Sequence, residues 1–273
     1  MRRNPIKQYA AQMVTAAAGV ASPQARALRK LRASALATPR YQPGEVSLDG
    51  LAIRYVDLLS VYMEYKDIVG QGIYSFEATN DRPRILDGGG YIGLSALTFK
   101  RKHSHARLTC FEPDPAMFEV LGHNLRSNGF GDVELVQAAL AAGDGEVAFE
   151  PDQADGGRIG EGGGEVVPTV RLSSYLDEPI DFLKLNIEGQ ELPVLQEAGD
   201  RLANVREMVL EYHGWADGEQ RLGPILDLLD DRGFRYLVNH FDYETNGAVR
   251  PPFEITKETT WFALVYARRA DLV

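Results

Sequence analysis

A glycine-rich turn after a short apolar run constrains the fold of this chain more than any other feature. Residues 85–94 read Ile-Leu-Asp-Gly-Gly-Gly-Tyr-Ile-Gly-Leu, and residues 108–113 read Leu-Thr-Cys-Phe-Glu-Pro. The apolar pair before Asp87 predicts the end of a buried strand, and the stretch from Ile92 to Phe99 predicts the helix that follows. Glu112 ends the next predicted strand, where a carboxylate can bind the hydroxyls of a ribose. This spacing predicts a pocket for a nucleotide-bearing cofactor.

Asp87 decides which cofactor the turn favours. A carboxylate at this position would face the pyrophosphate of NAD, whereas S-adenosylmethionine has no phosphate and carries a cationic ammonium and a sulfonium. We therefore predict S-adenosylmethionine rather than NAD. The alternative is a glycine turn that only packs a helix on a strand.

Length and composition indicate a globular protein with a full core. The chain has 273 residues, of which 44% are hydrophobic, enough for one large domain or a domain with an appendage. Its one cysteine, Cys110, excludes a disulfide framework within the chain, and its place in an apolar run predicts a buried, inert thiol. No stretch approaches the roughly 18 apolar residues that a membrane span needs. We expect a cytoplasmic protein.

Charge is distributed unevenly along the chain. The net charge is −10, yet residues 1–40 hold eight Lys or Arg and no acidic residue, which leaves −18 for the rest. Two short helices, over 5–19 and 23–36, that dock on the acidic body or on a second copy in a homodimer explain this arm. A secretory signal, or an arm that meets nucleic acid or an anionic membrane, is the alternative. Because the body is acidic, we do not expect nucleic acid as a partner.

Strand and helix patterns alternate from residue 84 onward. We predict a hairpin over 46–55 and a helix over 58–68 before this region, and a Rossmann-like, mostly parallel seven-stranded α/β sheet with helices on both faces within it. The last strand has no crossover helix after it, so it can insert antiparallel beside its predecessor. The expected domains are a basic helical extension over 1–45, a connecting hairpin and helix over 46–80, and the main domain over 81–273. The predicted strands are 84–87, 107–112, 133–137, 181–187, 206–212, 235–240 and 260–267, and the predicted helices are 92–102, 114–127, 190–199 and 217–232.

A glycine-rich and acidic segment interrupts this pattern. Residues 150–165 hold six glycines and five acidic residues with almost nothing apolar. Such a loop fits a lid over a site, and an idle solvent loop fits its composition equally well.

Polar residues gather at the ends of two predicted strands. Residues 181–191 read Asp-Phe-Leu-Lys-Leu-Asn-Ile-Glu-Gly-Gln-Glu, and residues 208–214 read Met-Val-Leu-Glu-Tyr-His-Gly. Glu211 and His213 are two positions apart, so both side chains point to one face of their strand. Ligands of such sheets bind at the carboxyl ends of the strands, which makes His213 a candidate general base. Helix capping by Glu191 and a surface role for the histidine are the structural alternatives.

These segments together resemble the FkbM family of S-adenosylmethionine-dependent methyltransferases. The resemblance covers about residues 84–215 and rests on the turn at 87–93, on Phe-Glu-Pro at 111–113, on Asn124 and Asn128, and on the two polar strand ends. It departs from the family pattern at two places: three glycines replace branched and small residues of the turn, and Asn186 replaces an Asp. An amide cannot serve as a base, so the latter change moves proton removal to His213 or Glu188.

The resemblance implies a class I methyltransferase fold and methyl transfer to a hydroxyl of a small molecule, such as a sugar, a polyketide or another secondary metabolite. It implies His213 as base, oriented by Glu211, and Lys184, Asn186 and Glu188 as positioning groups. The implied donor-binding residues are Asp87, Gly88, Gly89, Gly90, Ile92, Gly93, Glu112 and Pro113, with Gln137 and Ala138 along the adenine.

Three alternatives stay open at this point. An amine or carboxylate acceptor would need little or no base, and a protein that binds the donor without transferring the methyl group would need no acceptor site. A divalent ion held by Asn186, Glu211 and His213 is not favoured, but it is compatible with these residue types.

Overall fold

The computed structural model describes residues 23–150, 157–159, 164–240, 251–252 and 254–272. The chain divides into two compact units, Met1–Ile73 and Tyr74–Val273, and each is described by itself below. No helix among the described residues is both long enough and apolar enough to cross a membrane.

The first unit contains helices and one hairpin. The hairpin confirms the sequence prediction, because Asp49 and Gly50 adopt the positive φ angles, 51° and 81°, of a tight two-residue connection. Asp57 caps the helix after the hairpin by accepting a hydrogen bond of 3.0 Å from the backbone N–H of Ser60. The predicted helix over 5–19 lies outside the described residues. The elements of this unit are α2 (Pro23–Ala37), β1 (Gly44–Leu48), β2 (Leu51–Tyr55), α3 (Leu58–Glu64) and the π-helical segment η1 (Tyr65–Gln71).

The second unit is built on a seven-stranded mixed sheet with strand order β12-β13-β11-β10-β3-β4-β5. The predicted strands and helices are all present, and β13 is antiparallel to both β11 and β12, which confirms the expected insertion of the last strand. Its elements are β3 (Arg84–Gly88), α4 (Leu94–Lys102), β4 (Arg107–Phe111), α5 (Pro115–Ser127), β5 (Glu134–Val136), β10 (Ile180–Leu185), α6 (Glu191–Ala198), β11 (Val205–Trp215), α7 (Leu222–Asp231), β12 (Phe234–Asn239) and β13 (Thr260–Arg269), with 3₁₀ turns η2 (Leu172–Tyr175), η3 (Gly199–Asn204) and η5 (Ala270–Leu272).

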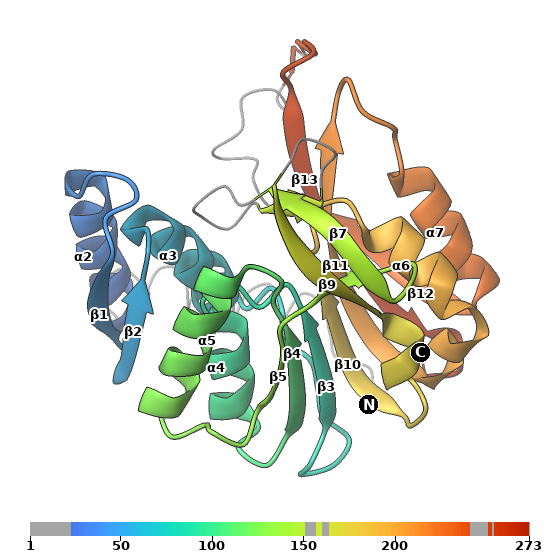
Figure 1. The fold of residues 1–273 in the computed structure, drawn as a ribbon, viewed down its shortest axis with the longest axis horizontal. Coiled ribbons are helices and arrows are strands. Elements are labelled where there is room, and N and C mark those ends of the chain that lie inside the picture. Colours follow the sequence, from blue (N-terminus) through green and yellow to red (C-terminus); the bar gives the residue numbers. More distant parts are fainter. Residues whose placement is uncertain (1–22, 151–156, 160–163, 241–250, 253, 273) are drawn as a thin grey trace, which may run out of the picture. The chain divides into compact units, whose positions relative to one another are not determined.

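The strand order places a topological switch between β3 and β10. From β3 the chain proceeds through β4 to β5 in one direction, and from β10 it proceeds to β11 in the other. Because crossovers between parallel strands are right-handed, α4 and α5 cover one face of the sheet, and α6 covers the other face together with α7 (Figure 1). Ligands of such sheets bind at the carboxyl ends of the strands on either side of the switch.

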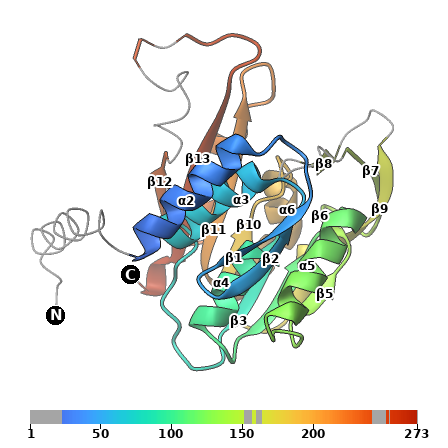
Figure 2. The same ribbon diagram turned by 90° about the vertical axis from the view of Figure 1, so that its left-hand side faces the viewer.

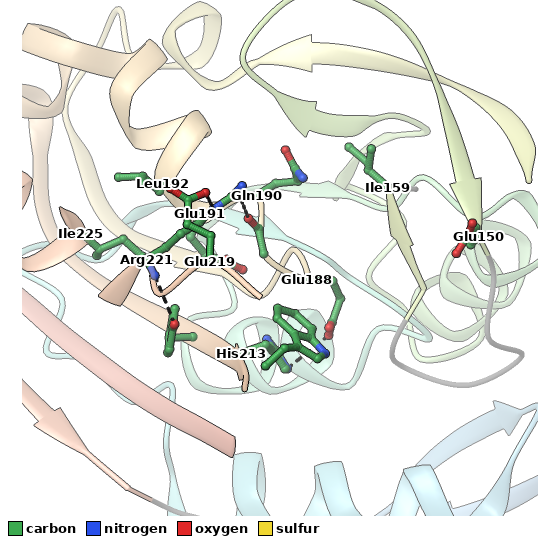
Figure 3. Close-up of a pocket in the computed structure, with 13 residues that line it drawn as sticks. Glu150, Ile159, Glu188, Gln190, Glu191, Leu192, His213, Glu219, Arg221 and Ile225 are labelled. Atoms are coloured by element: carbon green, nitrogen blue, oxygen red, sulfur yellow. Dashed lines mark hydrogen bonds and ion pairs between the residues drawn. The ribbon is translucent and has the colours of Figure 1, made fainter. Parts of the chain in front are cut away.

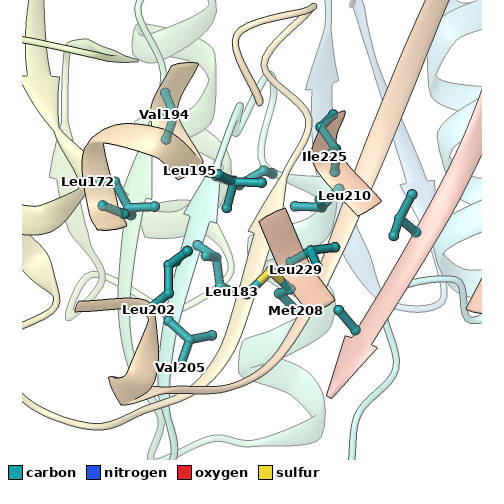
Figure 4. Close-up of a cluster of buried hydrophobic side chains, with 14 of the residues drawn as sticks. Leu172, Leu183, Val194, Leu195, Leu202, Val205, Met208, Leu210, Ile225 and Leu229 are labelled. Atoms are coloured by element: carbon teal, nitrogen blue, oxygen red, sulfur yellow. The ribbon is translucent and has the colours of Figure 1, made fainter. Parts of the chain in front are cut away.

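The two faces of β10 show how the core is divided. Leu183 and Leu185 belong to the cluster under α6 and α7, which Figure 4 shows between these helices and the sheet. Phe182 points to the opposite face, where its ring stacks on Phe76 with centroids 4.5 Å apart. Lys184, two positions on, therefore points toward the α4 face as well.

A second, four-stranded sheet is a feature that the sequence analysis missed. It lies between β5 and β10 in the chain, has the order β6-β9-β7-β8, and can be followed in Figure 2. Its apolar core is small, with Ala139, Phe149 and Val167 buried, so its alternation is hidden among glycines and charges. The predicted loop over 150–165 thus contains a short strand, although residues 151–156 and 160–163 lie outside the described residues. The four strands are β6 (Ala139–Ala141), β7 (Gly145–Glu150), β8 (Arg158–Ile159) and β9 (Glu165–Arg171).

Candidate active site

The glycine turn joins β3 to α4 at the predicted place. The backbone N–H groups of Gly89 and Gly90 both donate to the carbonyl oxygen of Phe111, at 3.0 and 2.8 Å. Gly93 is the N-cap of α4 and has a φ of 93°, a left-handed conformation that favours glycine. These contacts tie the turn to the end of β4, so that the ends of β3 and β4 form one surface.

Gly89 also fits closely against the end of β10. A Cβ atom on Gly89 would lie 1.9 Å from the carbonyl oxygen of Asn186, and Gly89 has a φ of 80°. The backbone N–H of Asn186 donates to the carbonyl oxygen of Gly88 at 3.1 Å. No side chain fits at Gly89 without a shift of backbone.

We expect Gly89→Ala to lower the free energy of unfolding by about 2–3 kcal/mol, because it combines left-handed strain with a backbone clash. The matched control is Gly129→Ala, since Gly129 has a φ of 82° and a Cβ atom there would meet no described atom within 4 Å beyond its chain neighbours. This control should lose about 1 kcal/mol from strain alone. Urea unfolding of both variants measures the difference, and equal losses would show that the contact with Asn186 has no energetic weight.

Asp87 and Lys184 form a buried ion pair beneath the turn. Asp87 is completely buried, Lys184 is 2% exposed, and Nζ of the lysine lies 3.1 Å from Oδ1 of the aspartate. Ser95 donates its hydroxyl to the other oxygen of Asp87 at 2.6 Å, and Lys184 also donates to the carbonyl oxygen of Gly89. Burial acts to lower the pKa of Lys184, but Asp87, together with Cys110 and Glu211, outweighs burial and holds that pKa above its usual value. The charge of Asp87 is thus compensated inside the protein, and its preference for a cationic donor does not by itself identify the cofactor.

Lys184 connects this pair to β11. Its Nζ lies 5.5 Å from the centre of the Tyr74 ring, and the Tyr74 hydroxyl donates to Oε2 of Glu211 at 2.5 Å. Burial raises the pKa of Glu211, although the Tyr74 hydroxyl and Lys184 oppose the shift. The Glu211 carboxylate is bonded to Tyr74, and the orientation of His213 by Glu211 stays a prediction.

The carboxylate partner of His213 is Glu188. Nε2 of His213 lies 3.3 Å from Oε1 of Glu188, and the two side chains are 8% and 12% exposed. Burial lowers the pKa of His213 to about 4, partly opposed by the Glu211 backbone. Glu188 has a φ of 52°, a conformation that is uncommon for residues other than glycine. The structure thus brings together two predicted residues from the ends of neighbouring strands.

Two further carboxyl groups are buried at this edge of the sheet. Glu112 accepts hydrogen bonds from the backbone N–H groups of Tyr91 at 2.7 Å and Asp114 at 2.9 Å, and burial raises its pKa to about 7. Glu191 accepts from the backbone N–H of Ile187 at 3.1 Å, and burial raises its pKa to about 7 as well. Both carboxyls therefore stabilise the backbone that follows a strand, and ribose binding by Glu112 stays a prediction.

The raised pKa of Glu191 predicts a pH dependence of stability. The folded state holds a proton on Glu191 that the unfolded chain releases near pH 4.3, so the stabilising contribution is full below that pH and is lost as pH rises to about 7. Glu191→Gln cannot ionise, and relative to the unsubstituted protein it should gain about 3 kcal/mol between pH 4.5 and pH 8. Urea unfolding at both pH values measures this gain, with the exposed Glu119→Gln as the matched control. An equal difference at the two pH values would contradict it.

The remaining predicted donor-site residues lie at the ends of β3, β4 and β5. Pro113 follows Glu112, and Gln137 and Ala138 directly follow β5, Gln137 exposed and Ala138 buried. Ile92 is completely buried, and its carbonyl oxygen accepts a hydrogen bond of 2.8 Å from the Asn124 side chain. Ile92 therefore supports the turn from within the core.

A cavity of about 320 Å³ opens beside the His213–Glu188 pair. In Figure 3, Glu150 and Ile159 approach it from the side opposite to Ile225. Four segments line it: the turn after β10 and the start of α6 (Glu188–Leu192), the end of β11 (Tyr212, His213, Trp215), the start of α7 and the residues before it (Glu219, Arg221, Ile225), and the β7–β8 hairpin (Glu150, Ile159).

The sequence analysis missed several of these lining residues. It predicted a helix over 217–232, whereas α7 begins at Leu222, so Glu219 and Arg221 lie in the connection from β11. Pro224 could have indicated the start of α7 from the sequence, because proline is tolerated only in the first turn of a helix.

The structure also bears on the metal ion that the sequence left open. Among the residues that the structure describes, no group of three or more His, Cys, Asp or Glu side chains is placed to hold a metal ion. Within the triad considered from the sequence, Glu211 is bonded to Tyr74 and His213 is paired with Glu188. Cys110 is completely buried, as predicted, and burial raises its pKa.

The sheet order, the antiparallel last strand and the glycine turn at the switch define a Rossmann-like class I methyltransferase. Residues 87–236 match the model of the methyltransferase FkbM domain, which is more than half of the chain. The chain belongs to the FkbM methyltransferase family, which confirms the resemblance found in its sequence.

Curated relatives support the methyltransferase assignment. The chain is 27% identical to the methyltransferase sdnD of Sordaria araneosa, over 70% of this chain and 89% of the relative. It is 28% identical to the 2-O-methyltransferase NoeI of Sinorhizobium fredii, over 54% of this chain and 71% of the relative. It is also 28% identical to the hexuronic acid methyltransferase AglP of Haloferax volcanii, over 49% of this chain and 57% of the relative.

Proposed function

We propose that this protein is an S-adenosylmethionine-dependent O-methyltransferase that acts on a hydroxyl group of a small molecule. The observation that carries the proposal is the His213–Glu188 pair, which joins the ends of β10 and β11 and lines the cavity. The name of one relative supports a hydroxyl acceptor, since it is a 2-O-methyltransferase, and the name of another supports a small sugar acid as acceptor without naming the atom that is methylated.

A buried oxygen of Asn186 supports the fit of the residues at the switch to the donor. Its side-chain oxygen Oδ1 is buried and has no hydrogen-bond partner among the described residues, and Asn186 lies against Gly88 and Gly89 at the switch. A buried acceptor without a partner costs free energy unless a ligand satisfies it. An N–H of the donor, such as its ammonium, fits this position. Gly88–Gly93, Glu112 and Ala138 would hold the rest of the donor.

The donor supplies a methyl group on a positively charged sulfur, which leaves as a neutral thioether when the acceptor oxygen takes the methyl group. An aliphatic hydroxyl is a poor nucleophile near neutral pH, so its proton must be accepted as the new carbon–oxygen bond forms. The imidazole of His213 takes this proton, and Glu188, whose Oε1 lies 3.3 Å from Nε2, then stabilises the imidazolium as an ion pair. Since burial lowers the pKa of His213 to about 4, the imidazole is in its neutral form at physiological pH, and proton uptake depends on the stabilisation of the imidazolium by Glu188.

Two measurements test the proposal. Calorimetry should show that S-adenosylhomocysteine binds and that NAD does not. Mass spectrometry of hydroxylated acceptors incubated with S-adenosylmethionine should then detect a methyl ether. Tight donor binding without a methylated product from any hydroxylated acceptor would favour a donor-binding protein, and methylated amines or methyl esters alone would favour the other acceptor classes.

A further inference from the structure

The cavity beside His213 has more carboxyl groups than cations in its lining. Its described residues include four carboxylic side chains, Glu150, Glu188, Glu191 and Glu219, and one guanidinium, that of Arg221. Burial keeps His213 uncharged near neutral pH, because its pKa is lowered to about 4. A concave site lined mainly by one sign of charge concentrates that potential within the cavity.

The Arg221 guanidinium is bonded to other groups of the protein. Its Nε lies 2.9 Å from Oε2 of Glu219, and its Nη1 donates to the carbonyl oxygen of Gly189 at 2.9 Å. This ion pair compensates the charges of both Arg221 and Glu219, and Arg221 also holds the turn after β10 in place. Because burial raises the pKa of Glu191 to about 7, the negative charge of the lining near neutral pH comes mainly from Glu150 and Glu188. In Figure 3 the guanidinium lies beside Glu191, away from Glu188 and His213.

The rest of the lining is aromatic and aliphatic. Trp215 is partly exposed, and its ring lies 6.0 Å from that of His213. Tyr212, Leu192 and Ile225 supply further apolar surface. An aromatic face next to carboxylate acceptors suits a ring with C–H groups on its faces and hydroxyl donors at its edge.

We infer that the acceptor of the proposed methyl transfer is a polyhydroxylated ring without an anionic group. Carboxylates accept hydrogen bonds from hydroxyl groups and repel a second carboxylate or a phosphate. This inference rests on the proposed function and narrows its substrate class. It separates this protein from a relative named for hexuronic acid, whose acceptor carries a carboxylate.

Binding of three matched probes tests the inference. The probes are methyl glucopyranoside, its uronate counterpart and its 2-amino-2-deoxy counterpart. Their binding to the full chain is measured by saturation-transfer NMR with S-adenosylhomocysteine present. We expect the neutral and amino probes to bind at least roughly tenfold more tightly than the uronate, because repulsion between like charges disfavours the latter. Equal or tighter binding of the uronate would overturn the inference, and so would the absence of binding by both other probes.

Glu219→Gln sharpens this test because it releases the charge of Arg221. The uronate should gain roughly fivefold in affinity, while the neutral probe changes little. The exposed Glu119→Gln on α5 removes the same charge far from the cavity lining and should leave both affinities unchanged. An unchanged preference in Glu219→Gln would count against the acidic lining as its cause.

Failure of the inference and failure of the proposed function give different results. Probe binding is read without methyl transfer, so a preference for uncharged probes without any methylated product would refute only the proposed activity. Competition between S-adenosylhomocysteine and the neutral probe would place the donor in this cavity and overturn the inference alone.

Discussion

Lys184→Met should lower the free energy of unfolding by about 3–5 kcal/mol, because it leaves the Asp87 carboxylate buried without its cation. Asp87 is completely buried, and the remaining side-chain hydroxyl that donates to it is that of Ser95. The substitution also removes the hydrogen bond to the carbonyl oxygen of Gly89, so the glycine turn loses a support from below. Urea unfolding measures the loss.

A double-mutant cycle separates the cost of leaving the Asp87 carboxylate without its cation from the cost of the packing lost at Lys184. Adding Asp87→Asn to Lys184→Met removes the uncompensated carboxylate, so the double variant should recover roughly 2 kcal/mol of the loss. Lys100→Met is the matched control: Lys100 is equally buried, but its partner Asp132 is 66% exposed at 2.8 Å. A solvated carboxylate tolerates the loss of its partner, so Asp132→Asn should give no recovery. If Lys184→Met cost no more than Lys100→Met, the buried pair would not be a main support of the site.

The ends of the parallel strands were predictable because their pattern is local. Glu211 and His213 share a face through the two-residue period of a strand, and the alternation of strand and helix places β10 and β11 in one sheet. The sequence could not show that His213 pairs with Glu188, since this contact depends on the left-handed backbone at Glu188 in the turn after β10.

The sequence could not show, for a different reason, that Lys184 compensates the charge of Asp87. Its partner Lys184 is nearly one hundred residues away in the chain, and the two strands become neighbours only because β10 pairs with β3 at the switch. The register, which aligns Lys184 with Asp87, then decides the contact. The sequence therefore showed the acidic residue of the turn but not the buried cation that compensates it.

His213→Ala should lower kcat by about 10²–10⁴-fold, the usual contribution of a positioned general base, while affinity for S-adenosylhomocysteine stays unchanged. The pH profile of the unsubstituted enzyme gives a second and more specific readout. Because the pKa of His213 is lowered to about 4, the neutral base form predominates above that pH, and activity should be lost only as pH falls through about 4.

An unperturbed histidine would instead lose activity between about pH 7 and pH 6, so the position of the acidic limb distinguishes a buried base from an exposed one. Glu188→Gln removes the anion that stabilises the imidazolium, so it should lower kcat as well and move the acidic limb to lower pH. The exposed His105→Ala is the matched control and should retain full activity. Near-normal turnover of His213→Ala would refute the base, and would favour an amine or carboxylate acceptor, whose methylation needs little or no proton removal by the protein.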